Sequence, residues 1–246
     1  MAKKNTGPLV ALAGMRYPDL HLEEKILAPL GCRMVSDLSD TEEKTIALAK
    51  DADAVIIGSI PKFTARAIES LENCRILSRA GIGVNNIDLD TAKKKGITVT
   101  NVPDYCIDEV SDHAMALILS FARKLPEAAA NTASGGWGII PLRPIEPLNQ
   151  STLGIVGIGR IGSTIGKKAL AFGMKIIYYN RNKLSSDLED GAKYFSDIES
   201  MMPECDFVSI HTPATAETKH ILNKSSISLL PKHAVVINTS RGSTID

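Results

Sequence analysis

The amino-acid sequence predicts an α/β protein built from two doubly wound parallel-sheet domains. Short apolar runs alternate with segments of helical period, as expected where helices bury both faces of the strands. The alternation occurs twice, over residues 9–102 and again from residue 151 onward, and a stretch rich in Pro and Gly separates the two series. With 246 residues, the chain is long enough to give each series its own core.

The first series forms the expected first domain, residues 1–105. Apolar runs predict five strands, at residues 9–13, 32–36, 54–58, 75–80 and 98–102. Helical patterns lie between them, at residues 21–29, 41–50, 64–71 and 89–95. Thr41 and Thr64 are suited to N-caps, whereas Gly31 and Gly96 are suited to the position that ends a helix.

A long helix is expected to open the second domain, residues 106–246. Apolar residues recur at helical spacing through residues 108–124, and Asp104 or Asp108 is the expected cap. Residues 126–150 show little periodicity and contain four prolines, so we expect them to run irregularly over the surface. Alternation then resumes, with strands at residues 153–157, 175–180, 207–211 and 234–239 and helices at residues 160–172, 197–202 and 224–230.

Charge and cysteine content limit the classes of partner. Lys plus Arg and Asp plus Glu number 28 each, so the zero net charge gives no support for nucleic acid or an anionic membrane as partner. The four cysteines are too far apart in sequence for a metal-binding or CxxC motif, and we expect reduced thiols and no bound metal. The apolar run at residues 8–13 is too short for a signal peptide or a membrane span. A cytoplasmic protein with a small-molecule ligand is therefore expected.

A Gly-x-Gly-x-x-Gly motif stands between an apolar strand and a helix at the start of the second series. Gly157 permits a tight turn, Gly159 lets a pyrophosphate approach the backbone, and Gly162 lets the helix pack close to the strand. The pyrophosphate would lie at the helix N-terminus, where Arg160 and Ile161 form the first turn. Glycines mark many turns, but this strand–turn–helix context favours dinucleotide binding.

The end of the next strand bears on the choice of cofactor. NAD-binding domains usually carry Asp or Glu there, about 20 residues after the glycines, to bind the adenosine ribose. This chain has Asn180 followed by Arg181, so the negative charge that would repel a 2′-phosphate is missing and a cation is present. The pattern favours NADP over NAD. The alternative is that Arg181 is a solvated loop residue and Asn180 binds the NAD ribose.

Seven sequence blocks together point to a known family. They are 79–88 (RAGIGVNNID), 96–103 (GITVTNVP), 109–114 (EVSDHA), 154–162 (GIVGIGRIG), 172–175 (FGMK), 211–213 (HTP) and 237–242 (INTSRG). In this order they resemble the D-isomer-specific 2-hydroxyacid dehydrogenases. The resemblance implies a flavodoxin-like substrate domain followed by a Rossmann nucleotide-binding domain. It also implies an oxidoreductase that transfers a hydride between NAD(P)H and a small 2-keto acid or D-2-hydroxy acid.

The resemblance also implies roles for individual residues. Arg241 matches the catalytic arginine, which would hold the keto acid by charge-assisted hydrogen bonds. The N–H groups of Ile82, Gly83 and Val84 match the loop that binds the substrate carboxylate, and the alternative for this loop is a plain turn after a strand. His113 matches a position that we interpret as structural. Cofactor contacts are implied at His211, Thr212, Pro213, Thr218, Thr239 and Ser240.

The chain departs from the family pattern in two places besides Asn180. Asn85 stands where Asp is more usual. The family's catalytic Glu and its proton-donating His follow the Arg-Gly block, whereas the given sequence ends at Asp246, so we expect these 246 residues alone to be inactive. The alternative function is a non-catalytic nucleotide sensor or corepressor-like module, but Arg241 and the carboxylate loop favour an enzyme. The resemblance further implies a homodimer formed through residues 108–150.

Overall fold

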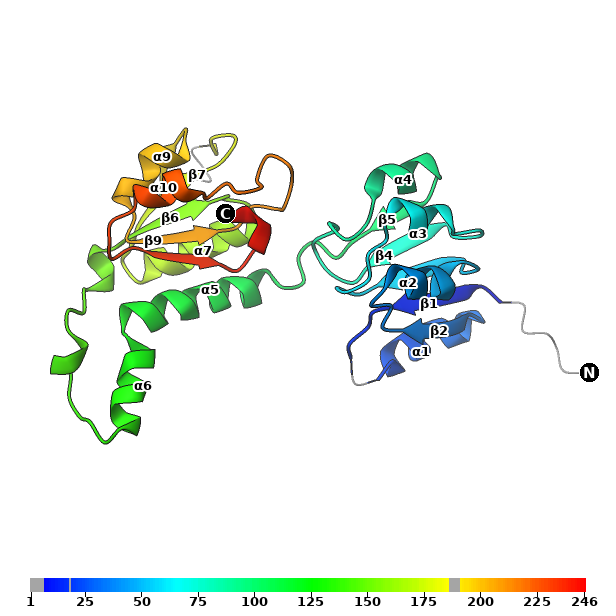
Figure 1. Cartoon of the computed structure of the whole chain (residues 1–246), viewed down its shortest axis with the longest axis horizontal. Helices are drawn as coiled ribbons and strands as arrows, with labels where there is room; N and C mark the ends of the chain where they lie inside the picture. Colours follow the sequence, from blue (N-terminus) through cyan, green and yellow to red (C-terminus); the bar gives the residue numbers. More distant parts are fainter. Residues whose placement is uncertain (1–6, 18, 186–190) are drawn as a thin grey trace, which may run out of the picture. The chain divides into compact units, whose positions relative to one another are not determined.

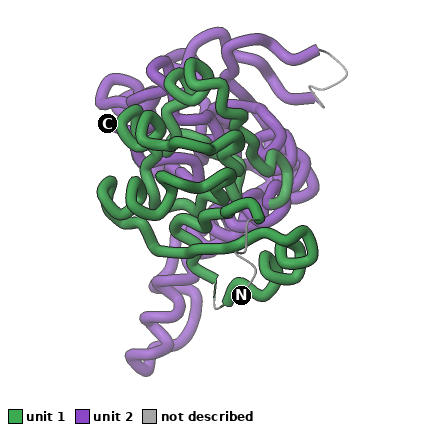
Figure 2. The backbone as a smooth tube through the Cα atoms, turned by 90° about the vertical axis from the view of Figure 1, so that its right-hand side faces the viewer, with its two compact units in different colours: residues 1–105 green, residues 106–246 purple. Residues whose placement is uncertain are grey.

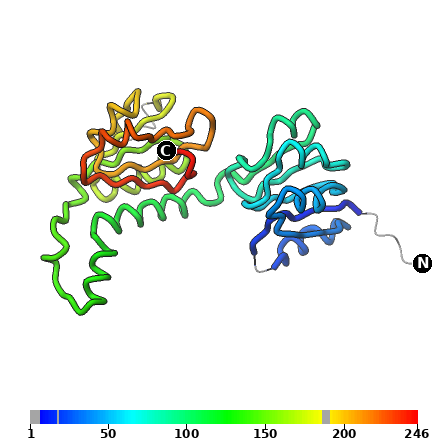
Figure 3. The backbone as a smooth tube through the Cα atoms, viewed as in Figure 1, coloured from blue at the N-terminus to red at the C-terminus, as the bar shows by residue number. Residues whose placement is uncertain are grey.

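A computed structural model describes residues 7–17, 19–185 and 191–246 of the chain. Two compact units make up the protein, residues 1–105 and residues 106–246 (Figure 2). Each unit contains one five-stranded parallel sheet with helices packed on it, which confirms the α/β class (Figures 1 and 3). Within the described ranges, no helix is both long and apolar enough to cross a membrane.

Unit 1 has the sheet order β2-β1-β3-β4-β5, which is the order of flavodoxin-like folds. Its strands are β1 (Leu9–Ala13), β2 (Arg33–Asp37), β3 (Ala54–Ile57), β4 (Ile76–Arg79) and β5 (Thr98–Thr100). The helices between them are α1 (His21–Leu27), the short 3-10 helix η1 (Ala28–Leu30), α2 (Glu42–Ala49), α3 (Ala65–Glu69) and α4 (Leu89–Lys94). All five expected strands and four expected helices are present, with ends shifted by a few residues.

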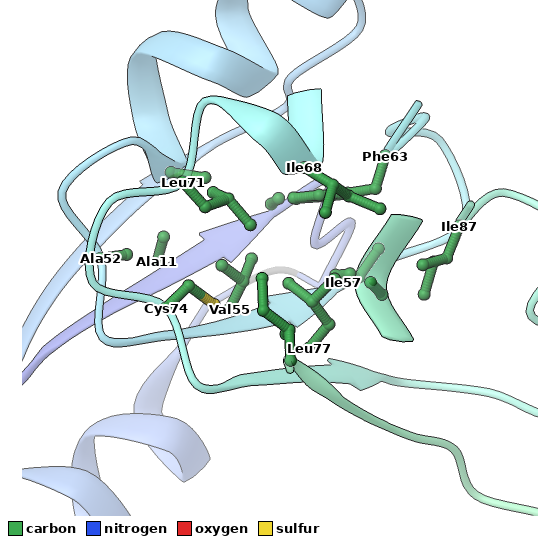
Figure 4. Packing of buried hydrophobic residues seen from close by; sticks show 14 residues of the cluster. Ala11, Ala52, Val55, Ile57, Phe63, Ile68, Leu71, Cys74, Leu77 and Ile87 are labelled. Atoms are coloured by element: carbon green, nitrogen blue, oxygen red, sulfur yellow. The ribbon is translucent and has the colours of Figure 1, made fainter. Parts of the chain in front are cut away.

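Local chemistry fixes the ends of these helices. The Thr41 hydroxyl accepts the N–H of Lys44 at 3.3 Å, and the Thr64 hydroxyl accepts the N–H of Ala67 at 3.2 Å, so both predicted N-caps are confirmed. Gly31 and Gly96 follow helical segments with φ of +74° and +72°, where a side chain would be strained. The core between helices and sheet is apolar; Figure 4 shows Ile68, Leu71, Val55 and Leu77 gathered in it.

The segment that opens unit 2 differs from expectation. Helix α5 (Ile107–Ala122) begins after Cys106, which makes no side-chain cap, so the predicted cap at Asp104 or Asp108 is wrong. Residues 125–133 form helix α6 (Leu125–Ala133) instead of an irregular run. Pro126 lies in the first turn of α6, where proline is compatible with a helix. Two 3-10 helices follow, η2 (Ile140–Leu142) and η3 (Leu148–Gln150).

The sheet of unit 2 has the order β10-β9-β6-β7-β8, which matches five strands of the Rossmann order. Its strands are β6 (Thr152–Val156), β7 (Lys175–Tyr179), β8 (Lys193–Phe195), β9 (Phe207–Ile210) and β10 (Val235–Asn238). Its other helices within the described residues are α7 (Arg160–Ala171), α9 (Ile198–Met201), η4 (Met202–Glu204), α10 (Lys224–Ser228) and η5 (Gly242–Thr244). Strand β8 was not expected; it has three residues and pairs only with β7.

Candidate nucleotide-binding and substrate-binding sites

The glycine-rich turn connects β6, in the middle of the sheet, to α7. Gly157 has a φ of +93°, which an L side chain rarely adopts. A Cβ at this position would also lie 2.8 Å from Cγ2 of Thr212 and 3.0 Å from its backbone nitrogen. The loop that follows β9 therefore packs directly on the turn, at a distance that requires glycine.

The other two glycines of the motif play different parts. A Cβ at Gly162 would lie 2.2 Å from the carbonyl oxygen of Gly157, so α7 packs against the turn with no room for a methyl group. A Cβ at Gly159 would meet nothing within 4 Å, which leaves an open approach to the backbone there. Arg160 and Ile161 form the first turn of α7, and no side chain caps this end of the helix. This end of α7 is therefore suited to bind an anion.

His211 is held inside the protein by its backbone and its ring. Its N–H donates to the carbonyl of Val156 at 2.8 Å, and its Nε2 lies 2.8 Å from the hydroxyl of Ser209. Burial lowers the pKa of His211 to about 4, because the interior disfavours the imidazolium. The ring is neutral near pH 7, so it positions the loop after β9 and is unsuited to donate a proton.

The rest of this loop is tied together by threonine. The Thr218 hydroxyl accepts the N–H of Thr215 at 2.8 Å and donates to the carbonyl of Pro213. The resemblance implied that Thr218 contacts a cofactor, but its hydroxyl is engaged in closing the loop 213–218.

Two threonine hydroxyls of unit 2 are buried without a partner. Across the described ranges, the buried side-chain polar atoms with no hydrogen-bond partner are Nε of Arg79 and the Oγ1 atoms of Thr212 and Thr239. A buried hydroxyl without a partner costs roughly 1–3 kcal/mol, so each of the two calls for an explanation. Both residues were implied as cofactor contacts by the resemblance, and a bound ligand would supply the missing partners.

The end of β7 places Asn180 and Arg181 just beyond Tyr179, the last residue of the strand. The Asn180 amide nitrogen donates to the carbonyl of Asn182 at 2.9 Å, which fixes the side chain on its own loop. The pKa of Glu217 is lowered, chiefly by a hydrogen bond from Thr215 and in smaller part by the positive charge of Arg181. The proximity of this carboxylate to Arg181 was not predicted from the sequence.

Arg241 lies in a hollow of about 600 Å³ within unit 2. One wall is a face of α5, which packs beside β10 (Figure 1). The other wall is the loop that follows β10. The lining residues are Glu109, Val110, His113 and Leu117 on α5, and Asn238, Thr239, Ser240, Arg241 and Gly242 on the loop.

The loop that carries Arg241 is organised by Asn238. The Asn238 amide nitrogen donates to the carbonyl of Arg241 at 2.9 Å, and its carbonyl oxygen accepts the N–H and the hydroxyl of Ser240 at 2.9 and 2.8 Å. Nη1 of Arg241 donates to the Ser240 carbonyl at 2.8 Å. These bonds bring Thr239, Ser240 and Arg241 together in the hollow.

Glu109, His113 and Asn238 were not predicted to be part of this site, although the helical spacing of residues 109, 113 and 117 would have placed three lining residues on one face.

Lys168 of α7 fixes the first turns of α5. Its ammonium group donates to Asp112 Oδ1 at 2.6 Å, Ser111 Oγ at 2.7 Å and Asp108 Oδ1 at 3.2 Å. The pKa of Lys168 is raised, chiefly by the hydrogen bond to Asp112. The α5 face that lines the hollow is therefore held in place from the opposite side of the helix.

In unit 1, the loop after β4 presents three adjacent backbone donors. Gly81 has a φ of +156°, and a Cβ there would lie 2.7 Å from Nη1 of Arg79. The Asn101 amide nitrogen donates to the carbonyl of Ile82 at 2.8 Å, which steadies the loop. The N–H groups of Ile82, Gly83 and Val84 have no acceptor within the described residues. Three such donors in a row are suited to bind a carboxylate.

The sheet order and the glycine turn together define the class of protein. It is an α/β protein whose second unit has a Rossmann-type nucleotide-binding fold. Residues 115–246 match the family model described as D-isomer specific 2-hydroxyacid dehydrogenase, NAD binding domain. The chain belongs to the D-isomer-specific 2-hydroxyacid dehydrogenase family.

Individual relatives agree with this assignment. A hydroxypyruvate reductase of Thermotoga maritima is 39% identical over 205 residues, which cover 83% of this chain and 66% of the relative. A D-3-phosphoglycerate dehydrogenase of Methanocaldococcus jannaschii is 39% identical over 207 residues, which cover 84% of this chain and 39% of the relative. The structure of D-lactate dehydrogenase from Aquifex aeolicus, complexed with NAD and lactic acid, matches with a TM-score of 0.87 at 31% identity, covering 96% of this chain and 70% of that one. The chain thus spans 66% and 39% of the length of these two curated relatives.

Proposed function

We propose that this protein acts in an NAD(P)-dependent oxidoreductase that interconverts a small 2-keto acid and the D-2-hydroxy acid. The observation that carries the proposal is that Arg241 and the partnerless hydroxyl of Thr239 line one hollow in the unit that carries the glycine turn. An arginine is suited to hold a carboxylate, and a ligand in the hollow could supply the partner that the hydroxyl lacks. Residues 1–105 would form the substrate domain and residues 106–246 the nucleotide-binding domain.

The residues of unit 2 fit a nicotinamide dinucleotide. The turn Gly157–Gly162 and the N–H groups of the first turn of α7 would bind the pyrophosphate. The hydroxyls of Thr212 and Thr239 would gain hydrogen bonds from the bound molecule. The nicotinamide ring supplies the hydride that a 2-keto acid accepts at its carbonyl carbon.

The protein's own residues would bind and orient the acid. Arg241 would pair with the carboxylate and polarise the carbonyl oxygen, where negative charge develops as the hydride arrives. In unit 1, the N–H groups of Ile82, Gly83 and Val84 would be suited to bind a carboxylate. His211 is not the proton donor in this scheme, since burial lowers its pKa to about 4.

Calorimetric titration with NADH and NADPH, followed by oxamate on the cofactor-loaded protein, tests the proposal. We expect micromolar binding of at least one cofactor and binding of oxamate, a keto-acid analogue, only after the cofactor. The proposal is refuted if neither nicotinamide cofactor binds.

The cofactor preference is the first specific prediction. Arg181 follows the end of β7, the strand end that binds the adenosine ribose in Rossmann domains, and no carboxylate occupies position 180, so NADPH should bind more tightly than NADH. Arg181→Ala should weaken NADPH by about 10- to 100-fold, or roughly 1.5–3 kcal/mol for a charge-assisted contact, and leave NADH nearly unchanged. Lys175→Ala, at the opposite end of β7, is the matched control and should affect neither. Equal affinities of the unaltered protein for both cofactors would contradict the prediction.

We further propose a homodimer formed through α5 and the segment that follows it. This region exposes large apolar side chains, with Trp137 91% and Ile140 78% exposed. Such exposure is typical of surfaces that another chain covers. Light scattering at micromolar concentration should give twice the monomer mass, and Trp137→Glu combined with Ile140→Glu should give monomers. Leu30→Glu, at an apolar side chain of unit 1 that is 69% exposed, should not change the mass. A monomeric unaltered protein would refute the proposal.

A further inference from the structure

Three acidic residues lie in the first two turns of α5, and the structure divides them between two faces. Asp108 and Asp112 are one helical turn apart and both pair with Lys168 of α7, at 3.2 and 2.6 Å. Glu109 lies on the other face, with Val110, His113 and Leu117, and lines the hollow of Arg241. Within the described part of the chain, the Glu109 carboxylate has no hydrogen bond and no ion pair. It is an exposed negative charge in a hollow suited to an anion.

The charges of the hollow are therefore nearly balanced before any ligand enters. Arg241 is its cationic side chain, Glu109 its anionic one, and His113 its remaining titratable group. A substrate whose carboxylate pairs with Arg241 uses the positive charge that the hollow offers. Any further negative group on that substrate would be repelled by Glu109, and no second cation among the lining residues would pair with it.

We propose that Glu109 selects against substrates that carry a second anionic group, so that this protein acts on small monoanionic 2-keto acids and D-2-hydroxy acids. This inference rests on the proposed function and narrows its substrate class. Among the relatives, one is named for hydroxypyruvate, a monoanion, and one for 3-phosphoglycerate, which adds a phosphate. A phosphate brings about two more negative charges at neutral pH. Like charge placed at a binding site is a common means of excluding the wrong ligand.

Glu109 can affect the stability of its own helix as well as a ligand in the hollow. A glutamate in the first turn of a helix favours the helix whatever else it does, because it complements the positive end of the dipole. Glu127 occupies the equivalent position in α6, third from the start, and does not line the hollow. It is therefore a matched control: Glu127→Gln and Glu109→Gln remove the same helix interaction, but only Glu109→Gln removes a charge from the hollow.

The test compares two ligands that differ only by a phosphate. D-glycerate and 3-phospho-D-glycerate are titrated calorimetrically into protein saturated with the oxidised form of whichever cofactor binds more tightly. We expect D-glycerate to bind at least tenfold more tightly than its phosphate ester. Glu109→Gln should tighten binding of the ester by about three- to tenfold and change the affinity for D-glycerate by less than twofold. The effect is modest because solvent screens the field of an exposed charge. Raising the salt concentration should shrink this difference.

Glu127→Gln should leave both affinities as they are. The inference is overturned if the unaltered protein prefers the phosphate ester, or if Glu109→Gln shifts the two ligands equally. If neither acid binds to cofactor-loaded protein, the proposed function itself fails, and the inference fails with it. Binding of both acids with a ratio insensitive to Glu109 leaves the proposed function standing and removes only the role of Glu109.

Discussion

In a form of the protein that reduces a 2-keto acid, replacing Arg241 by alanine is expected to lower kcat/KM by about 10²- to 10⁴-fold, equivalent to a loss of roughly 3–5 kcal/mol of transition-state binding. Loss of the guanidinium group would leave both the substrate carboxylate and the developing negative charge on the carbonyl oxygen poorly paired. The same variant should reduce the affinity of cofactor-loaded protein for oxamate, which gives a readout independent of turnover.

One further variant separates charge from geometry at this position, and a variant of another arginine is the control. Arg241→Lys keeps the charge but cannot form two parallel hydrogen bonds, so it should recover only part of the loss. Arg143→Ala removes an arginine that lines a different hollow and should leave kcat/KM within about twofold, as is usual for surface substitutions. If Arg241→Ala stayed within threefold of the unaltered protein in both measurements, Arg241 would have no part in the reaction.

The alternation of elements could be predicted because parallel strands buried on both faces leave apolar runs of strand length. Strand β1 (Leu9–Ala13) coincides with the expected residues 9–13, and the Thr41 and Thr64 caps form the predicted hydrogen bonds. The roles of the glycines in the turn after β6 could also be predicted. Gly157 has a positive φ and Gly162 makes a close backbone contact, and both positions require glycine.

What could not be predicted depends on tertiary contacts. Strand β8 (Lys193–Phe195) has too few residues for a periodic signal and is a strand because it pairs with β7. Helical spacing alone puts Glu109 on a different face from Asp108 and Asp112, but it does not show that Lys168 pairs with those two across the helix interface. The pairing of the Thr218 hydroxyl with Pro213 also follows from how the loop closes, which the motif alone does not specify.

Gly162→Ala should abolish tight cofactor binding. The new methyl carbon would lie 2.2 Å from the carbonyl oxygen of Gly157, which is backbone and cannot swing away as a side chain can. Helix α7 must then move away from the turn by about 1 Å. A displacement of that size at a binding site can cost about 10²-fold, and the overpacking itself should lower the free energy of unfolding by about 1–3 kcal/mol.

Gly166→Ala is the control for Gly162→Ala, because it makes the same substitution one turn further along α7. Its Cβ would lie 3.3 Å from Cδ1 of Ile155, the tip of a flexible side chain that can shift by a few tenths of an ångström. Alanine also favours the helix over glycine by up to about 1 kcal/mol, so this variant should match or slightly exceed the unaltered protein in thermal stability and should retain its NADPH and NADH affinities. Thermal unfolding and cofactor titrations of both variants test whether their stabilities and cofactor affinities differ in this way. Equal cofactor affinities for Gly162→Ala and Gly166→Ala would mean that the contact between α7 and the turn at Gly157 does not shape the dinucleotide site.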